Sequence, residues 1–127
     1  MENCRVDDMK RMAFDKKIKP VKFVDDSLEI PVSDWAALSL TFVNWLIQKG
    51  HLTKGNLPIP NHANRGKYFI NSEPFHKYRE KDGDWHNIGS FHIDTKYNAQ
   101  AHVNNIISTL RFLRVHSPSF RITFRKY

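Results

Sequence analysis

The sequence is poor in cysteine, since its 127 residues include only Cys4. One cysteine excludes an internal disulfide framework and a zinc finger with several cysteine ligands, and it fits a reducing compartment. No run of about 18 apolar residues is present, so the sequence predicts no membrane-spanning helix. Residues 1–17 also lack the apolar segment of a secretory signal peptide. We therefore expect a soluble cytoplasmic protein that does not bind membranes.

Motifs for the common kinds of catalytic and cofactor-binding sites are also missing. The chain has five glycines, and none of them forms a glycine-rich phosphate-binding loop or the Gly-x-Ser-x-Gly turn of serine hydrolases. It has no HExxH motif and no pair of CxxC motifs, which bind zinc in many proteins. The sequence therefore predicts no catalytic residue, no metal and no cofactor, and it favours a protein that is not an enzyme.

Positive charge is what the chain has in excess. It has 20 lysines and arginines against 13 acidic residues, which gives a formal net charge of +7. This excess attracts polyanions such as nucleic acid, acidic lipid headgroups or an acidic protein. Hydrophobic residues make up 40% of the chain, which is enough to form a core and argues against a disordered chain. The length is typical of one domain.

Two segments have apolar side chains at spacings of three and four, which is typical of amphipathic helices. The first spans about 34–49, with Ser33 as a suitable N-cap and Gly50 as a residue that can adopt the left-handed conformation after a helix. The second spans about 98–115, with Asn98 or Thr95 as its cap. Their expected core-facing residues are Trp35, Leu38, Phe42, Trp45 and Leu46, and Ala99, Val103, Ile106, Leu110 and Leu113.

The remaining segments have strand and loop patterns. Residues 20–31 predict a strand, or a hairpin that turns at residues 25–27, and residues 67–71 and 85–93 predict one strand each. Phe120 to Arg125 alternates apolar and basic residues, so this segment predicts a half-buried strand with its basic side chains outward. Residues 1–19 carry charges of both signs and predict a loose N-terminal arm or one frayed helical turn. Residues 51–66, which are rich in Pro, Gly and Asn, predict a long loop.

The order of these elements predicts an α+β fold. Strand, helix, strand, strand, helix, strand is the order of a ferredoxin-like domain, in which two helices pack on one face of a mainly antiparallel sheet. We expect one such domain over residues 20–127, preceded by the arm at 1–19.

Basic side chains near the C-terminus are the candidate binding residues. The last 17 residues contain five basic residues and no acidic one. A row of outward arginines on the last strand could neutralise successive phosphates of DNA or RNA without contacting bases. Two residues of an earlier segment, Arg65 and Lys67, would extend the row if their strand lies nearby, and Tyr68 or Trp85 could stack on a base. The candidate nucleic-acid-binding residues are Arg111, Arg114, Arg121, Arg125, Lys126, Lys67 and Arg65.

Two other kinds of function stay open at this point. Exposed strand edges, the arm and the long loop would suit a protein-interaction adaptor that binds no nucleic acid, and the edges would also allow a homodimer. Alternatively, His86, His92 and Asp94 on one strand face, with His102 nearby, would suit a small histidine- or metal-dependent hydrolase.

One stretch resembles a known kind of domain. The segment from Ile88 to Val103, IGSFHIDTKYNAQAHV, and the helix start at Pro31 to Trp35, PVSDW, are similar to a small accessory domain of bacterial restriction and phage-defence proteins, which often carry nuclease-like modules. The resemblance covers about residues 28–124 and carries no catalytic residue. It implies an auxiliary role in a nucleic-acid-handling system, with nucleic acid or a nuclease-like protein as the partner.

Overall fold

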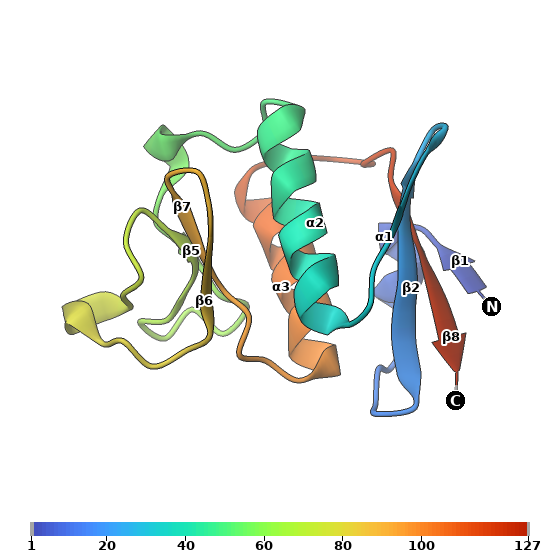
Figure 1. Ribbon diagram of the computed structural model, residues 1–127, viewed down its shortest axis with the longest axis horizontal. Helices are drawn as coiled ribbons and strands as arrows, with labels where there is room; N and C mark the ends of the chain where they lie inside the picture. The colour runs from blue at the N-terminus through green and yellow to red at the C-terminus, as the bar shows by residue number, and fades with distance from the viewer. Residues whose placement is uncertain (1, 127) are drawn as a thin grey trace.

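Two helices lie between two antiparallel β-sheets in the computed structural model, which describes residues 2–126 (Figure 1). Sheet A has the strand order β1-β8-β2-β3, and sheet B has the order β4-β5-β7-β6. The two long helices, α2 (Trp35–Gln48) and α3 (Ala99–Phe112), form the middle layer. The predicted α+β class with antiparallel pairing is confirmed, but the strands form two sheets instead of one ferredoxin-like sheet.

Sheet A joins segments from the two ends of the described chain. Its strands are β1 (Glu2–Cys4), β2 (Ile18–Asp25), β3 (Leu28–Pro31) and β8 (Arg121–Lys126), and the short helix α1 (Val6–Met9) follows β1. β8 pairs with β1 on one side and with β2 on the other. The hairpin of β2 and β3 turns at Asp26 and Ser27, as predicted.

Sheet B is formed by the middle of the chain. Its strands are β4 (Ile59–Pro60), β5 (Tyr68–Asn71), β6 (Trp85–Ile88) and β7 (Phe91–Asp94). Two short 3-10 helices, η1 (Lys54–Asn56) and η2 (Lys77–Arg79), lie in its connections. None of the helices in residues 2–126 is long and apolar enough to cross a membrane.

The long helices begin at side-chain caps. Asn98 accepts a hydrogen bond from the backbone N–H of Ala101 at 2.9 Å, as expected for the cap of α3. In α2 the cap is Asp34, whose Oδ1 accepts from the N–H of Ala37 at 2.7 Å, so the cap is one residue later than the expected Ser33. The carboxylate is also favoured there by the helix dipole.

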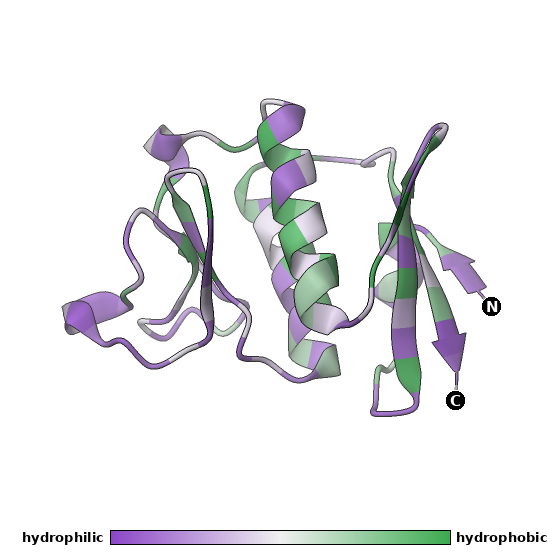
Figure 2. Cartoon of the chain, in the orientation of Figure 1, coloured by the Kyte–Doolittle hydropathy of each residue, from purple (hydrophilic) through white to green (hydrophobic). Residues whose placement is uncertain are grey.

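The core fills the space between the layers. All five predicted residues of the α2 stripe are buried, as are Val103, Ile106 and Leu110 of α3. α3 lies between two sheets and therefore has a second buried face, which is polar: His102, Asn105 and Thr109 are each at most 1% exposed. Figure 2 shows this mixture of hydrophilic and hydrophobic residues along α3. Buried polar groups need partners, and Asn105 Oδ1 accepts from the N–H of His62 at 2.9 Å.

The N-terminal segment does not form the loose arm that was expected. β1 pairs with β8 through the partners Glu2–Phe124, Asn3–Thr123 and Cys4–Ile122. Met9 is 1% exposed, and Phe14 is 6% exposed. Residues 2–17 therefore cover one edge of sheet A and belong to the folded domain.

The predicted strand 85–93 is instead a hairpin. β6 and β7 are joined by Gly89 and Ser90, and Gly89 has a φ of +57°, which is a turn conformation favoured by glycine. The turn reverses the chain, so His86 pairs with Ile93 and Asn87 pairs with His92.

Candidate nucleic-acid interface

The outer face of sheet A, which points away from the helices, has an excess of positive charge. Directly paired residues in an antiparallel sheet point to the same face. Phe23 and Ile122 are paired and fully buried, so the residues next to them along β2 and β8 point outward. The outward basic residues of β2 and β8 are Lys19, Lys22, Arg121 and Arg125, and these four are called the cationic face here.

Few carboxylates oppose these charges. Glu29 is the acidic residue among the outward positions of β2, β3 and β8, and it lies 3.2 Å from Nζ of Lys22. Lys19 is exposed and directly opposite Arg125. Within residues 2–126, no carboxylate oxygen lies within 4 Å of Nζ of Lys19. Lys19 and Arg121 are therefore the members of this face that can contact an external anion without losing an ion pair within residues 2–126.

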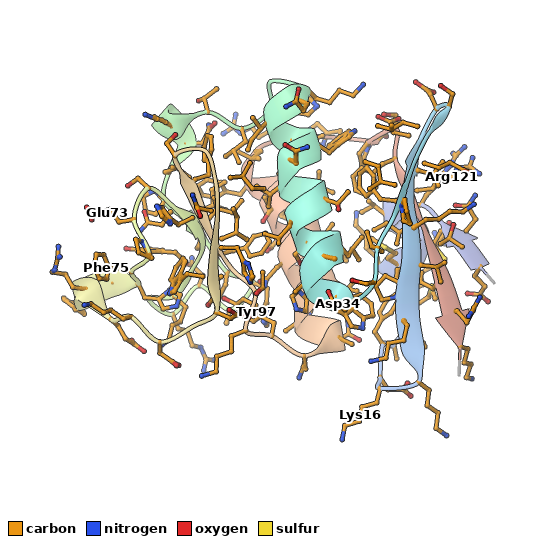
Figure 3. The ribbon with its side chains drawn as sticks, in the orientation of Figure 1. Lys16, Asp34, Glu73, Phe75, Tyr97 and Arg121 are labelled. Carbon is orange, nitrogen blue, oxygen red and sulfur yellow. The ribbon has the colours of Figure 1, made fainter. Side chains whose placement is uncertain are left out.

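Arg121 and Arg125 are arranged on β8 as the sequence predicted. They are four residues apart on one strand, so their side chains point to the same face and their Cα atoms are separated by roughly 13 Å. Figure 3 shows the Arg121 side chain leaving β8 on the side away from the helices. Thr123 lies between them on this face, yet it is 4% exposed and its hydroxyl has no hydrogen-bond partner within the described residues.

A groove continues from Arg121 toward the end of α3. Its first part has a volume of about 600 Å³ and is lined by two arginines, Arg5 and Arg121, two carboxylates, Asp7 and Asp26, and the Ser117–Ser119 segment. The adjoining part, about 360 Å³, is lined by Lys10 and Arg111. The two parts share Val6, Asp7, Ser117 and Pro118, so the predicted residues Arg111 and Arg121 lie along one surface.

Two further predicted residues lie at the borders of this region. Arg114 is exposed and follows α3 with a φ of +56°. Lys126 pairs with Ile18 at the end of β8 and lines a different hollow, which contains Glu2 and Met12. Lys16 and Lys17 lie just before β2, at the same end of the sheet as Lys126, and Figure 3 places Lys16 at this end of the molecule.

Arg65 and Lys67 do not extend the cationic face. Lys67 precedes β5 of sheet B, at the opposite end of the longest axis of the molecule from β8 (Figure 1). It also forms an ion pair with Glu80. The two residues expected to stack on a base are not fully exposed either. Tyr68 and Trp85 are half-buried, and Trp85 Nε1 donates to the carbonyl of Lys81 at 3.2 Å.

The hairpin turn separates the histidines that were expected to form a hydrolytic site. His86 faces the same side as Ile93, whereas His92 and Asp94 face the other side. Nε2 of His86 lies 3.4 Å from Oδ1 of Asp84. Oδ2 of Asp94 lies 3.2 Å from Nε2 of His76, so Asp94 is paired with a histidine outside the expected group. In the described part of the chain, no group of three or more His, Cys, Asp or Glu side chains could hold a metal ion. The predicted face of His86, His92 and Asp94 is therefore wrong.

Two buried histidines, His76 and His102, each contact a polar side chain of another element. His76 Nδ1 accepts from the N–H of Tyr68 at 2.8 Å, so its Nε2 carries the proton that faces Asp94. His102 Nδ1 lies 2.7 Å from the hydroxyl of Ser39, which joins α3 to α2. Ser39 is 0% and His102 1% exposed, so no substrate can reach this pair. Burial lowers the pKa of His102 to about 4, which keeps it neutral near pH 7.

Comparisons with known proteins give no identity for this arrangement. The chain matches no known family, no curated protein and no solved structure. The resemblance to accessory domains of restriction and phage-defence proteins therefore stays a prediction, as does the cytoplasmic location.

Half of the cationic face was missed in the sequence. Lys19 and Lys22 were assigned to an arm and to a strand without a function, because their pairing with β8 joins residues about a hundred positions apart. The spacing Lys19-x-x-Lys22 crosses a bulge between Pro20 and Lys22, which puts both on one face despite an odd separation. The local signal was only the group of four lysines between 16 and 22.

Proposed function

We propose that this protein binds nucleic acid through the cationic face of sheet A. The main support is the register of β2 and β8, which places Lys19 and Arg121 on one face of sheet A, where Glu29 is the acidic residue among the outward positions of β2, β3 and β8. Side chains of this kind neutralise phosphates and release counterions, and they position a nucleic acid without selecting its sequence.

The charge pattern favours a polyanion over a simple protein-binding edge. Lys19 is exposed and has no carboxylate oxygen within 4 Å among residues 2–126, so its charge is available to an external anion. The free edge strand β3 has only four residues and carries Glu29 and Pro31, which are typical of an edge that avoids pairing. An adaptor that binds only protein is therefore the second candidate and an outcome of the test.

The test is a salt titration of binding. Fluorescence anisotropy would measure the affinity for labelled duplex DNA, single-stranded DNA and RNA between roughly 50 and 200 mM salt. We expect the affinity to fall at least about tenfold over this range. Arg121→Gln and Lys19→Gln should each weaken binding to all sequences alike and reduce the slope of log K against log salt by about one.

Lys54→Gln is the matched control. Lys54 is exposed on η1, away from sheet A, and its substitution removes the same charge. It should change the salt slope by much less than the two test substitutions. Equal effects of all three variants, or no binding to any nucleic acid at the lowest salt, would overturn the proposal. Capture of a specific protein together with absent nucleic-acid binding would support the adaptor instead.

A further inference from the structure

The most exposed aromatic side chain of the described residues is Tyr78, which is 91% exposed. It lies in the loop formed by residues 75–81, called the Tyr78 loop here, at the end of the molecule opposite sheet A (Figure 1). A tyrosine that packs against nothing loses the favourable burial of its ring. A reason other than folding is therefore needed for its position.

The backbone of this loop holds Tyr78 in an unfavourable conformation. Tyr78 and Arg79 have φ values of +61° and +60°, which lie in the left-handed region that residues with a side chain rarely adopt. Two such residues in succession persist only where the surrounding structure fixes them. Strain of this kind is common in loops that present a side chain to a ligand.

The base of the loop is fixed by hydrogen bonds. The N–H of His76 donates to the carbonyl of Glu80 at 2.7 Å and closes the turn, and the N–H of Lys77 donates to the carbonyl of Gly66 at 3.0 Å. His76 itself is 3% exposed and paired with Asp94. These hydrogen bonds fix the backbone at the base of the loop that carries the exposed ring. Little conformational entropy would therefore be lost when a ligand contacts the ring.

One basic side chain lies beside the Tyr78 ring, and two more lie over the neighbouring ring of Phe75. Lys77 Nζ lies 5.2 Å from the centre of the Tyr78 ring, and Arg79 and Lys81 lie over the ring of Phe75 at 4.5 and 5.5 Å. Residues 65–81 contain five lysines and arginines and two acidic side chains, and one of the acids, Glu80, is paired with Lys67. Figure 3 shows Phe75 at this end of the molecule, far from Arg121.

We propose that the Tyr78 loop is a second site, at which Tyr78 stacks on an unpaired base of single-stranded nucleic acid while Lys77 and Arg79 contact the flanking phosphates. An exposed aromatic ring within a positive surface is the combination that binds single strands independently of sequence. The inference rests on the proposed function and adds that the chain distinguishes single strands from duplexes. A membrane is less well matched, because the loop presents one exposed ring among cations, and its second ring, Phe75, is half-buried beneath Arg79.

The test compares two oligomers of equal charge. One is a 12-residue thymidine oligonucleotide, and the other is the same phosphate backbone with abasic residues. The readout is the ratio of the two affinities measured by anisotropy. Tyr78→Ala should lower this ratio about 5- to 150-fold, since base stacking on an aromatic side chain is worth ~1–3 kcal/mol. Tyr78→Phe should retain the ratio, because the ring remains.

Matched variants separate stacking from charge and from folding. Phe112→Ala removes an aromatic side chain that is 49% exposed elsewhere and should leave the ratio unchanged. Lys77→Gln and Arg79→Gln should weaken binding to both oligomers alike. Thermal unfolding of Tyr78→Ala should match the unsubstituted protein, since the side chain is almost fully exposed.

The outcomes also separate this proposal from the cationic face. A ratio that Tyr78→Ala leaves within twofold of its original value would overturn the stacking site, whatever Arg121→Gln does. A ratio that depends on Tyr78 while Arg121→Gln has no effect would support the stacking site and reject the cationic face. Loss of binding to phosphatidylserine vesicles in Tyr78→Ala, with the oligomer ratio unchanged, would assign the loop to a membrane and overturn the proposal.

Discussion

Lys19 and Arg125 lie directly opposite each other in the antiparallel pair of β2 and β8, so two positive side chains project from one face of sheet A. Such pairs are usually unfavourable, and opposite charges at the same positions are favourable by roughly 0.2–1 kcal/mol. A substitution at Lys19 can therefore change the stability of the fold and the affinity for an anion in opposite directions.

The first prediction concerns Lys19→Glu. We expect this substitution to raise the free energy of unfolding, because the new carboxylate would face Arg125, and to weaken binding to DNA and RNA, because it reverses a charge of the cationic face. Urea denaturation and anisotropy at low salt measure the two effects. Lys54→Glu is the control for net charge. A variant that is less stable but binds equally well would contradict the assignment of this face.

The second prediction is a pH dependence of stability that arises from His102. Burial lowers its pKa from 6.5 to about 4, and Ser39 and the backbone of Thr95 occupy its ring nitrogens. The unfolded chain therefore binds a proton between these pH values that the folded chain does not, so stability is complete above pH 6.5 and falls as the pH is lowered to about 4. The loss from this group is roughly 3 kcal/mol at most.

Urea denaturation at a series of pH values between neutral and acidic measures this dependence. His102→Gln should reduce it, although the variant is also less stable at pH 7 because Ser39 loses its partner. Burial also lowers the pKa of His62, so His62→Gln is the comparison that removes a second histidine contribution of the same sign. The attribution fails if the difference in stability between pH 7 and pH 4.5, a value inside the titration range, is the same in His102→Gln as in the original chain.

The third prediction concerns Gly83, which lies beside the buried carboxylate of Asp94. A Cβ at Gly83 would be 2.8 Å from Asp94 Oδ1 and 2.9 Å from Trp85 Nε1, and its φ of +148° is unsuitable for alanine. Asp94 cannot easily move, since Oδ1 accepts hydrogen bonds from the N–H groups of Asp84 and Lys96, both at 3.0 Å. Gly83→Ala should therefore destabilise the protein by roughly 1–3 kcal/mol.

Gly55→Ala is the control for this substitution. Gly55 has an ordinary φ, and a Cβ there would meet only Thr53 Oγ1 at 3.7 Å. We expect Gly55→Ala to change the midpoint of thermal unfolding little. If both variants unfold at the same temperature as the original chain, the rigid environment of Asp94 described above is wrong.

Local patterns in the sequence were sufficient for the helices and for the strand at the C-terminus. The apolar spacing of α2 and α3 and the alternation in β8 depend on neighbouring residues only, and these elements form where the patterns predict them. The two-sheet arrangement was not predictable in this way, because it depends on which strands pair. Gly89 illustrates the limit: a glycine inside an apolar run fits both a bulge and a two-residue turn, and only the turn is present.

The residues of the candidate sites also divide into those that local patterns predict and those that depend on distant pairing or on a turn. Arg121 and Arg125 were predicted to point outward because alternation on one strand is a local property. Lys19 was missed, since its place beside Arg125 depends on pairing with a distant strand. Tyr78 was also missed, because a single aromatic residue among charged neighbours has no periodicity, and its exposure follows from the turn closed by His76 and Glu80.

The central place of β8 in sheet A has a consequence for the order in which the protein folds during synthesis. β1 and β2 both pair with β8 and not with each other, so sheet A cannot close before residues 121–126 have emerged from the ribosome. Until then, Phe23, which is fully buried in the finished domain, lacks its β8 partner Ile122 and the ring of Phe120, on which it stacks at 4.8 Å. The nascent chain therefore exposes this apolar surface while the residues between β2 and β8 are being made, and it is most prone to aggregate or to bind a chaperone in that interval.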